Sequence, residues 1–191
     1  MTELIGFVFL GLFSPGPNVI LLTTSGARFG FRATLPHLLG VALGCGVIAF
    51  VAGFGLALLL ERYPNFRVAL GLIAAGWILW MAWRLWHAQP ARVSDADRPF
   101  TFIEALLFQW VNPKIWAVAL SASAIVGQMS PLTKAVTLAV TFCVVNLGVC
   151  LFWTYAGSLL RALLSDPVRW RRFMRTMAVA LALCAGLVLL G

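Results

Sequence analysis

The chain has 191 residues, of which 62% are hydrophobic and only 10% are charged, and its net charge is +8. A mean hydropathy of +0.97 exceeds what a soluble core requires, so the composition predicts an integral membrane protein. The basic residues are dispersed between apolar runs and form no nucleic-acid-binding module. This pattern excludes nucleic acid as a partner and leaves the lipid bilayer as the expected surroundings.

Six apolar runs are long enough to cross a hydrocarbon core about 30 Å thick, which takes about 20 helical residues. They cover residues 3–24, 37–60, 67–87, 104–127, 133–160 and 173–190. No positively charged leader precedes the first run, so we expect it to stay in the mature protein. The sequence therefore predicts an all-α membrane protein with six transmembrane helices in a single domain over residues 1–191.

The first run contains an interruption, Ser14-Pro15-Gly16-Pro17-Asn18. Proline inside a helix removes a backbone donor and clashes with the preceding turn, at a cost of about 3 kcal/mol. Backbone groups freed in hydrocarbon must be buried in protein or line a wet cavity. The break thus indicates either a binding site built from backbone or a proline kink that neighbouring helices satisfy. The fourth run has a comparable break at Asn112-Pro113-Lys114.

A polar segment from Ala88 to Pro99 divides the chain into two sets of three helices. We predict a first repeat over residues 1–87, a cytoplasmic linker over 88–103 and a second repeat over 104–191. Because each repeat has an odd number of helices, the second crosses the membrane upside down relative to the first. Such an inverted repeat is typical of transporters.

Short matches between the two halves support the repeat. Arg32-Ala33 corresponds to Lys134-Ala135, and Gly44-x-Gly46 corresponds to Asn146-x-Gly148, each pair at an offset of 102. At a rise of about 1.5 Å per residue, both breaks fall about 15 Å into their runs. We therefore predict that the two breaks lie near the membrane midplane and are reached from opposite sides.

The basic residues favour one orientation of the chain. Ten of them lie in or beside the loops after the first, third and fifth runs: Arg28, Arg32, Arg84, Arg92, Arg98, Arg161, Arg169, Arg171, Arg172 and Arg175. The opposite face has only Arg62, Arg67 and Lys134. Because cytoplasmic loops are enriched in Lys and Arg, this distribution predicts that those three loops are cytoplasmic and that both termini lie outside.

Polar residues at and between the breaks form a candidate site. A helix that restarts at Pro17 presents free amides and a positive dipole end to an anion, and the carbonyls released before the break accept from a cation. A small zwitterionic amino acid offers both charges. The candidate substrate-binding residues are Pro15, Gly16, Pro17, Asn18, Gln109, Asn112, Pro113, Lys114 and Asn146.

Lys114 has two interpretations. A lysine near the bilayer centre costs about 2.5–3.5 kcal/mol on insertion scales, so it needs a partner or a cavity. In the first interpretation Lys114 is charged while it pairs with substrate and neutral while the empty carrier resets, which would couple export to proton uptake. In the second it is a structural lysine that holds the first break.

The six acidic residues lie in loops or at helix ends: Glu3, Glu61, Asp95, Asp97, Glu104 and Asp166. Without a carboxylate at the midplane, the sequence has neither a ligand set for a divalent metal nor the machinery of a membrane hydrolase. We expect no cofactor, no metal site and no enzymatic activity. The four cysteines fall inside apolar runs without Cys-x-x-Cys spacing and are predicted to be packing residues. A membrane thiol electron carrier and a metal-ion exporter are the competing classes.

Four motifs resemble the lysine exporter (LysE/RhtB) family of bacterial amino-acid efflux carriers, and the resemblance covers essentially the whole chain. The motifs are Ser14-Pro-Gly-Pro-Asn18, Gly26-x-x-x-Gly30-x-Arg32-Ala33, Gly40-x-x-x-Gly44 and Val111-Asn112-Pro113-Lys114. The resemblance implies proton-driven export of small amino acids from the cytoplasm. It also implies six-helix proteins in the bacterial inner membrane that form homodimers.

One departure from the family pattern lies in the second helix. Many members have an acidic residue just after its second glycine and a histidine three residues later, where this chain has Cys45 and Ile48. The departure disfavours cationic substrates and carboxylate-based proton coupling. Together with Ala82-Trp83 and the stretch from Phe108 to Asn112, it makes the chain more similar to the cysteine and O-acetylserine exporter branch. The expected substrates are small neutral amino acids or derivatives, and basic amino acids or homoserine and threonine are the alternative.

Overall fold

The structure of the protein is a computed structural model, which describes residues 1–55, 64–88, 98–127, 129–164 and 166–190. Within these ranges the backbone forms helices and no β-strand, as the apolar runs predict. The α-helices are α1 (Thr2–Phe13), α2 (Pro17–Phe29), α3 (Phe31–Gly53), α5 (Pro64–Trp86), α6 (Phe102–Phe108), α7 (Pro113–Ile125), α8 (Pro131–Leu163) and α9 (Pro167–Leu190), and a 3-10 turn, η1, covers Gln109–Val111.

Proline determines where several helices begin. α2, α5, α7, α8 and α9 each have proline as their first residue, a position where the absent amide has no intrahelical partner to lose. α6 begins instead with a capping box. The Thr101 hydroxyl accepts from the Glu104 amide at 3.2 Å, and the Glu104 carboxylate accepts from the Thr101 amide at 2.8 Å. These local signals are all readable in the sequence.

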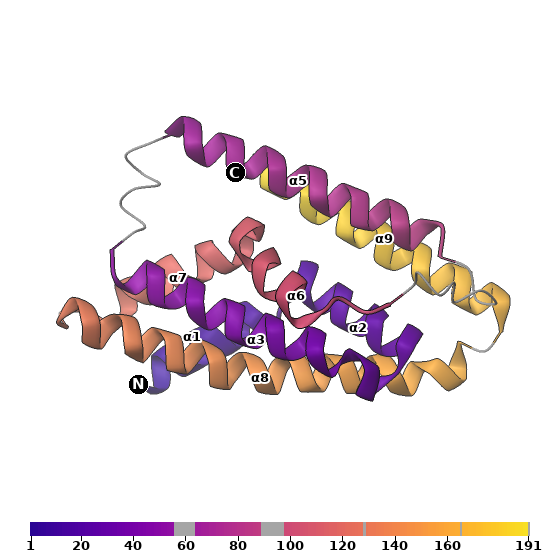
Figure 1. The fold of residues 1–191 in the computed structure, drawn as a ribbon, viewed down its shortest axis with the longest axis horizontal. Helices are drawn as coiled ribbons and strands as arrows, with labels where there is room; N and C mark the ends of the chain where they lie inside the picture. Colours follow the sequence, from indigo (N-terminus) through magenta and orange to yellow (C-terminus); the bar gives the residue numbers. More distant parts are fainter. Residues whose placement is uncertain (56–63, 89–97, 128, 165, 191) are drawn as a thin grey trace.

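The antiparallel pair α3 and α8 forms the centre of the first core (Figure 1). Leu38 and Ile48 of α3 and Leu138 and Phe142 of α8 are completely buried in it. α1, α2 and α7 pack around this pair. The first core therefore joins helices from both halves of the sequence.

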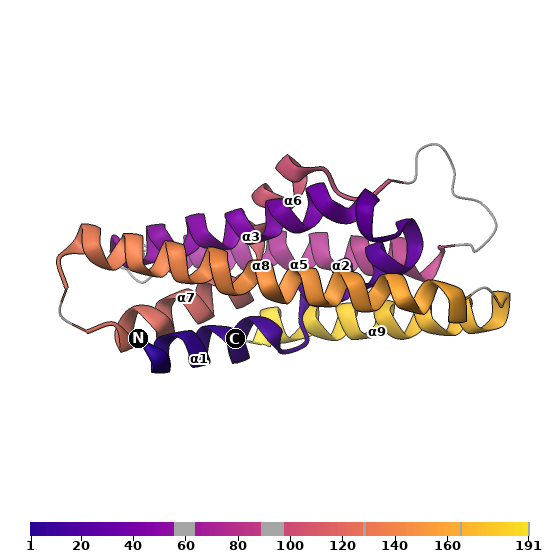
Figure 2. The same ribbon diagram turned by 90° about the horizontal axis from the view of Figure 1, so that it is seen from below.

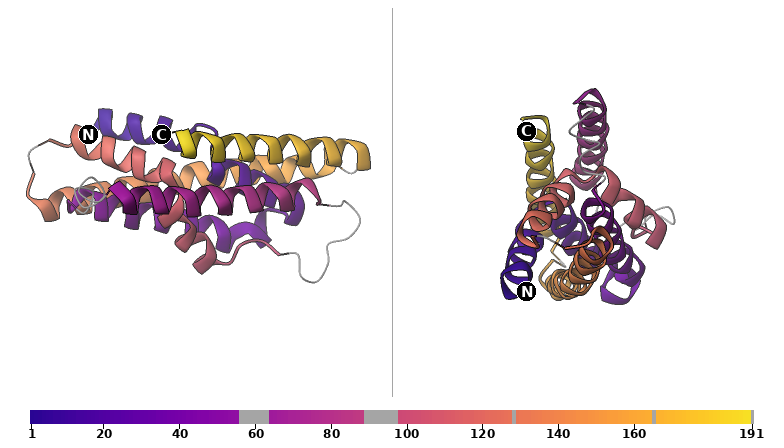
Figure 3. Two further views of the ribbon diagram at one scale, coloured as in Figure 1. Left: turned by 90° about the horizontal axis from the view of Figure 1, so that it is seen from above. Right: turned by 90° about the vertical axis from the view of Figure 1, so that its left-hand side faces the viewer.

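A second antiparallel pair, α5 and α9, runs along the top of Figure 1 and stands apart from α8 in the end-on view of Figure 3. Ile78 of α5 and Met174 and Leu181 of α9 are buried between them. α2 links the two cores, because its Ile20 belongs to the second core and its Leu22 to the first. The helix that follows the first break thus touches both parts of the molecule.

Among the described residues, two helices are long and apolar enough to cross a membrane, Phe31–Gly53 and Pro131–Arg161. The bent pair α1 and α2 passes the same test as one broken span, which gives up to three. The chain is therefore a multi-pass membrane protein by length and composition.

Helix boundaries differ from the predicted runs mainly at their starts. α3 begins at Phe31 rather than at residue 37, and α9 begins at Pro167 rather than at residue 173. Arginine is a good helix former, so a helix continues past the apolar segment that lies in hydrocarbon. Most of the predicted linker, residues 89–97, lies outside the described residues, as do residues 56–60 of the second predicted run.

Several helix ends meet at one end of the molecule. α2, α5 and α8 end there and α3 and α9 begin there, at the right-hand end of Figures 1 and 2. Arg28, Arg84 and Arg161 lie in the last turns of α2, α5 and α8. We call this the basic end. α1 begins and α9 ends toward the opposite end.

Candidate functional site

Two interruptions of the chain meet inside the first core. Ser14, Pro15 and Gly16 separate α1 from α2, whose axes differ by 59°. Asn112 alone separates η1 from α7, and its backbone is extended. Each interruption ends with a proline that starts the next helix, Pro17 for α2 and Pro113 for α7. Both helices therefore direct their positive dipole ends into the same region.

Lys114, in the first turn of α7, connects the second interruption to the first. Its Nζ donates to the carbonyl oxygen of Ser14 and, at 3.4 Å, to that of Pro15. A Cβ on Gly16 would lie 2.8 Å from Lys114 Cδ, so glycine leaves the space that the lysine side chain occupies. The cation thereby supplies donors to carbonyls at the point where α1 has ended.

A pair of side-chain amides forms a second connection. Asn18 Nδ2 donates to Gln109 Oε1 at 2.8 Å, and Gln109 Nε2 donates to Asn18 Oδ1 at 3.2 Å. Gln109 Nε2 also donates to the Ala105 carbonyl at 2.8 Å. Cys45 of α3 lies beside the pair, with its Sγ 3.5 Å from Gln109 Oε1. Because Gln109 is completely buried, the complementary amides satisfy each other without water.

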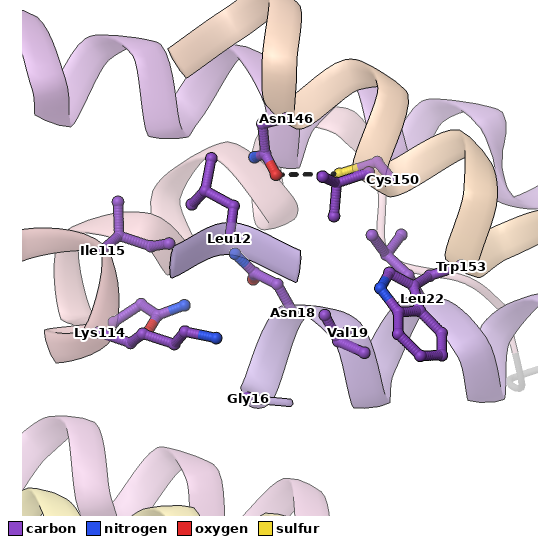
Figure 4. Close-up of a pocket in the computed structure, with 12 residues that line it drawn as sticks. Leu12, Gly16, Asn18, Val19, Leu22, Lys114, Ile115, Asn146, Cys150 and Trp153 are labelled. Atoms are coloured by element: carbon purple, nitrogen blue, oxygen red, sulfur yellow. Dashed lines mark hydrogen bonds between the residues drawn. The ribbon is translucent and has the colours of Figure 1, made fainter. Parts of the chain in front are cut away.

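A small cavity lies between the interruptions and α8 (Figure 4). Its polar lining consists of Asn18, Asn112, Lys114, Asn146 and Trp153, and its apolar lining includes Leu12, Val19, Leu22, Ile115 and Val149. The volume of about 10 Å³ corresponds to about one water molecule. An amino acid therefore requires the surrounding helices to move apart.

Three polar atoms of this lining are buried without a hydrogen-bond partner. They are Asn112 Oδ1, Asn146 Nδ2 and Trp153 Nε1. Buried polar atoms in folded proteins are nearly always paired, so a cavity that gathers one free acceptor and two free donors suits a polar ligand. None of the described residues that line the cavity has a carboxylate, so negative charge at this lining is expected from the ligand.

The structure brings the candidate residues together from distant parts of the sequence. Asn18, Asn112, Lys114 and Asn146 line the cavity, together with Gly16. Gln109 lies behind it and holds Asn18. The remaining candidates act through the backbone: Pro15 through its carbonyl, and Pro17 and Pro113 as the first residues of their helices.

Sequence reasoning missed Trp153 and Cys150, which also line the cavity. Both lie on the face of α8 that carries Asn146, because positions four and seven residues apart fall on one side of a helix. Counting helical turns from Asn146 would therefore have pointed to both residues.

Cys45 and Cys150 are buried, whereas Cys143 and Cys184 are only half-buried, and all four are free thiols. Within the described ranges no group of His, Cys, Asp or Glu could hold a metal ion.

A second cavity of about 70 Å³ lies at the basic end, between α2, α3, α5 and the segment before α6. Its lining includes Arg28, Arg84, Arg98 and His37. Arg98 donates to both carboxylate oxygens of Glu104, at 2.6 and 2.7 Å. These hydrogen bonds raise the pKa of Arg98, so the guanidinium is charged at any physiological pH.

Comparison with known proteins identifies the family of the chain. The family model described as LysE type translocator matches residues 9–191. The chain belongs to the LysE family. The prediction that it resembles this family is confirmed, and a translocator family also confirms the prediction of a transporter rather than an enzyme. No solved structure matches the chain.

Curated relatives align over almost the whole chain. A cysteine/O-acetylserine efflux protein of Klebsiella pneumoniae is 28% identical over 183 residues, which is 94% of this chain and 91% of the relative. A cysteine/O-acetylserine efflux protein of Escherichia coli K12 is 26% identical over 180 residues, which is 93% of this chain and 89% of the relative. Both relatives are named as efflux proteins, and the chain itself is a translocator of the LysE family.

Proposed function

We propose that the protein exports small neutral amino acids or their derivatives from the bacterial cytoplasm and binds them in the cavity between the two chain interruptions. One observation carries the proposal: within the part of the chain that the structure describes, this cavity gathers a lysine, two helix N-termini and three unpaired polar atoms, and no carboxylate. The names of the curated relatives support the same substrate class.

The two charges of an amino acid fit different parts of this site. The carboxylate is favoured near the N-termini of α2 and α7, where first-turn amides and the helix dipoles attract an anion. The ammonium group needs acceptors, and the carbonyl oxygens of Ser14 and Pro15 are available for it once Lys114 releases them. A cationic side chain has no carboxylate in the lining to pair with, so neutral substrates fit best.

Lys114 provides a means of coupling export to protons. Its Nζ occupies the carbonyl oxygens that a substrate ammonium would use, so the charged lysine and the substrate compete for one site. In our proposal Lys114 loses its proton to the cytoplasm when substrate binds. It regains a proton from the outside after substrate leaves and then replaces the ammonium on the two carbonyls.

In this cycle Lys114 is neutral while substrate is bound and charged while the carrier is empty, which reverses the order predicted from the sequence. A lysine that is charged with substrate and neutral when empty would carry one proton outward with each amino acid. Such a cycle opposes proton uptake and cannot use an inward proton gradient. Competition gives the opposite result, because the proton crosses inward on the empty carrier and each exported amino acid exchanges for one proton.

The wider architecture of the proposal is six transmembrane helices arranged as a 3+3 inverted repeat. Its support is the packing of counterparts: α3 packs mainly on α8, and α5 packs mainly on α9. These are the second and third helices of each predicted repeat. Two repeats related by an axis in the membrane plane place such counterparts side by side.

The function is tested with purified protein in liposomes loaded with unlabelled amino acid. We expect labelled serine, alanine and cysteine to enter by counterflow, and labelled lysine to enter at least tenfold more slowly. Protein-free liposomes and liposomes that contain an unrelated membrane protein serve as controls. Counterflow of lysine alone, or of no amino acid, would contradict the proposal.

A further inference from the structure

We propose that Asn146 and Trp153 of α8 donate hydrogen bonds to the substrate side chain. They thereby select small amino acids whose side chain carries a hydrogen-bond acceptor such as a hydroxyl oxygen. The inference rests on the proposed function, since it takes the cavity between the interruptions as the binding site. It assigns side-chain recognition to α8, whereas the charged groups of the substrate are bound at the interruptions.

Two unpaired donors in one wall of the cavity are the starting observation. Asn146 Nδ2 and Trp153 Nε1 are both buried without a partner, and both residues line the cavity. They are seven residues apart, so two full turns of α8 place them on the same face. A buried donor without an acceptor is unfavourable, and an acceptor on the bound substrate removes that penalty for the donor that it reaches.

Neighbouring residues contact both donor side chains. Cys150 Sγ lies 3.7 Å from Asn146 Oδ1, which leaves Nδ2 as the free end of that amide. The Trp153 ring packs against Phe13, with 5.1 Å between the ring centroids, and against Phe152, with 5.4 Å. Figure 4 shows Asn146 above the cavity and the Trp153 indole at its right, across from Lys114 at its left.

The residues between the two donors limit the size of the side chain that fits. Val149 and Cys150 are buried and complete this wall of α8. A long side chain would have to displace them or the Trp153 ring, which Phe13 holds in place. The wall therefore suits a side chain of a few heavy atoms with an oxygen near its end.

Serine and alanine form the sharpest pair of probes, because they differ by a single hydroxyl oxygen. We expect wild-type protein in liposomes to exchange serine at least tenfold faster than alanine at equal, subsaturating concentrations, as a site built to bond a hydroxyl discriminates against its absence. Trp153→Phe keeps an aromatic ring but removes the N–H. It should reduce the serine-to-alanine ratio by about tenfold, and the ratio is the readout because a loss of exchange common to both amino acids cancels in it.

Trp170→Phe is the matched control. Trp170 of α9 is also buried with an unpaired Nε1, but it belongs to the second core and does not line the cavity. We expect this variant to retain the wild-type ratio. Asn146→Leu, which keeps the number and branching of the side-chain heavy atoms and removes the amide, is the second variant and should also lower the ratio.

The outcomes separate this inference from the function on which it rests. If the wild type exchanges alanine as fast as serine, or if Trp153→Phe and Asn146→Leu slow both amino acids equally, the inference is wrong and the exporter proposal stands. If the wild type exchanges no amino acid, the proposed function itself has failed. A variant that does not accumulate leaves the other variant and the wild-type ratio to decide the outcome.

Discussion

At the scale of single residues, the position of the Lys114 side chain requires a glycine at residue 16. The lysine donates to the Ser14 and Pro15 carbonyls from the opposite half of the chain. Its stem passes over Gly16, where any Cβ would approach Lys114 Cδ to 2.8 Å. The Gly16 backbone is extended, with φ near 180°, so space rather than backbone conformation requires the glycine. The prolines interrupt the helix, and Gly16 leaves room for the Lys114 side chain, which donates hydrogen bonds to the carbonyls exposed by the interruption.

Substitutions of Lys114 test the competition between proton and substrate. Lys114→Gln cannot titrate, so we expect it to exchange labelled for unlabelled amino acid yet fail to accumulate amino acid when the liposome interior is acidic. For one-to-one exchange, a gradient of one pH unit sustains about a tenfold accumulation in the wild type. Lys114→Arg keeps a permanent charge on the carbonyls and should lose both activities.

Lys134→Gln is the control for these variants, because Lys134 lies in the first turn of α8 and does not line the cavity. We expect it to pump normally. Accumulation by Lys114→Gln under the same pH gradient would show that another group carries the proton and that Lys114 only holds the first break.

At the scale of helices, glycines set how closely α2 and α8 approach. A Cβ on Gly157 of α8 would overlap the carbonyl of Thr23 in α2, and a Cβ on Gly26 of α2 would overlap the carbonyl of Thr154 in α8. Small residues that let backbones touch are the usual basis of helix association in membranes. Because α2 starts at the first interruption and α8 lines the cavity, this crossing fixes the separation between the walls of the site.

Gly157→Ala should destabilise the protein by about 1–3 kcal/mol, since the new methyl group meets backbone that cannot rotate away. Gly148→Ala is the matched control in the same helix, because a methyl group at this position would meet nothing within 4 Å beyond the adjacent backbone of α8 itself and alanine favours helix over glycine. Thermal unfolding in detergent should show a lower midpoint for the first variant and an equal or higher midpoint for the second. Equal midpoints would mean that α2 and α8 are not packed as closely as described.

At the scale of the whole molecule, the ends of five helices create the basic end. Arg28, Arg84 and Arg161 come from three separate helices and meet there only because those helices run in matching directions. The cavity of about 70 Å³ at this end lies where cytoplasmic amino acid would approach in the proposed orientation. Positive charge at this end suits both the cytoplasmic side and a substrate carboxylate.

Orientation is the prediction at this scale. A reporter that is active only in the cytoplasm should work when fused within residues 88–99, between α5 and α6, and should not work when fused after Gly191. The reason is the excess of basic residues at the end of the molecule where α5 finishes. Activity at the C-terminus and none in the linker would reverse the orientation and place the larger cavity outside.

Local chemistry determined much of the fold. The apolar runs located the long helices, and Pro17 and Pro113 marked where the chain restarts after each break. The same signals led to Asn18, Gln109, Asn112 and Lys114, because polar residues beside a broken helix in an apolar run are rare and expensive. Helix starts were less predictable, since α3 and α9 begin outside the apolar segment.

What the sequence by itself determined was a multi-pass helical membrane protein with two interruptions and polar residues beside them, because period, proline and hydropathy act over a few residues. Only the tertiary structure decided that Lys114 reaches the carbonyls of Ser14 and Pro15, about 100 residues away, and that Asn18 pairs with Gln109. It also decided that Trp153 joins Asn146 in one cavity wall. These contacts depend on how α2, α7 and α8 pack together, and packing between distant helices is set by the whole core rather than by any short stretch of sequence.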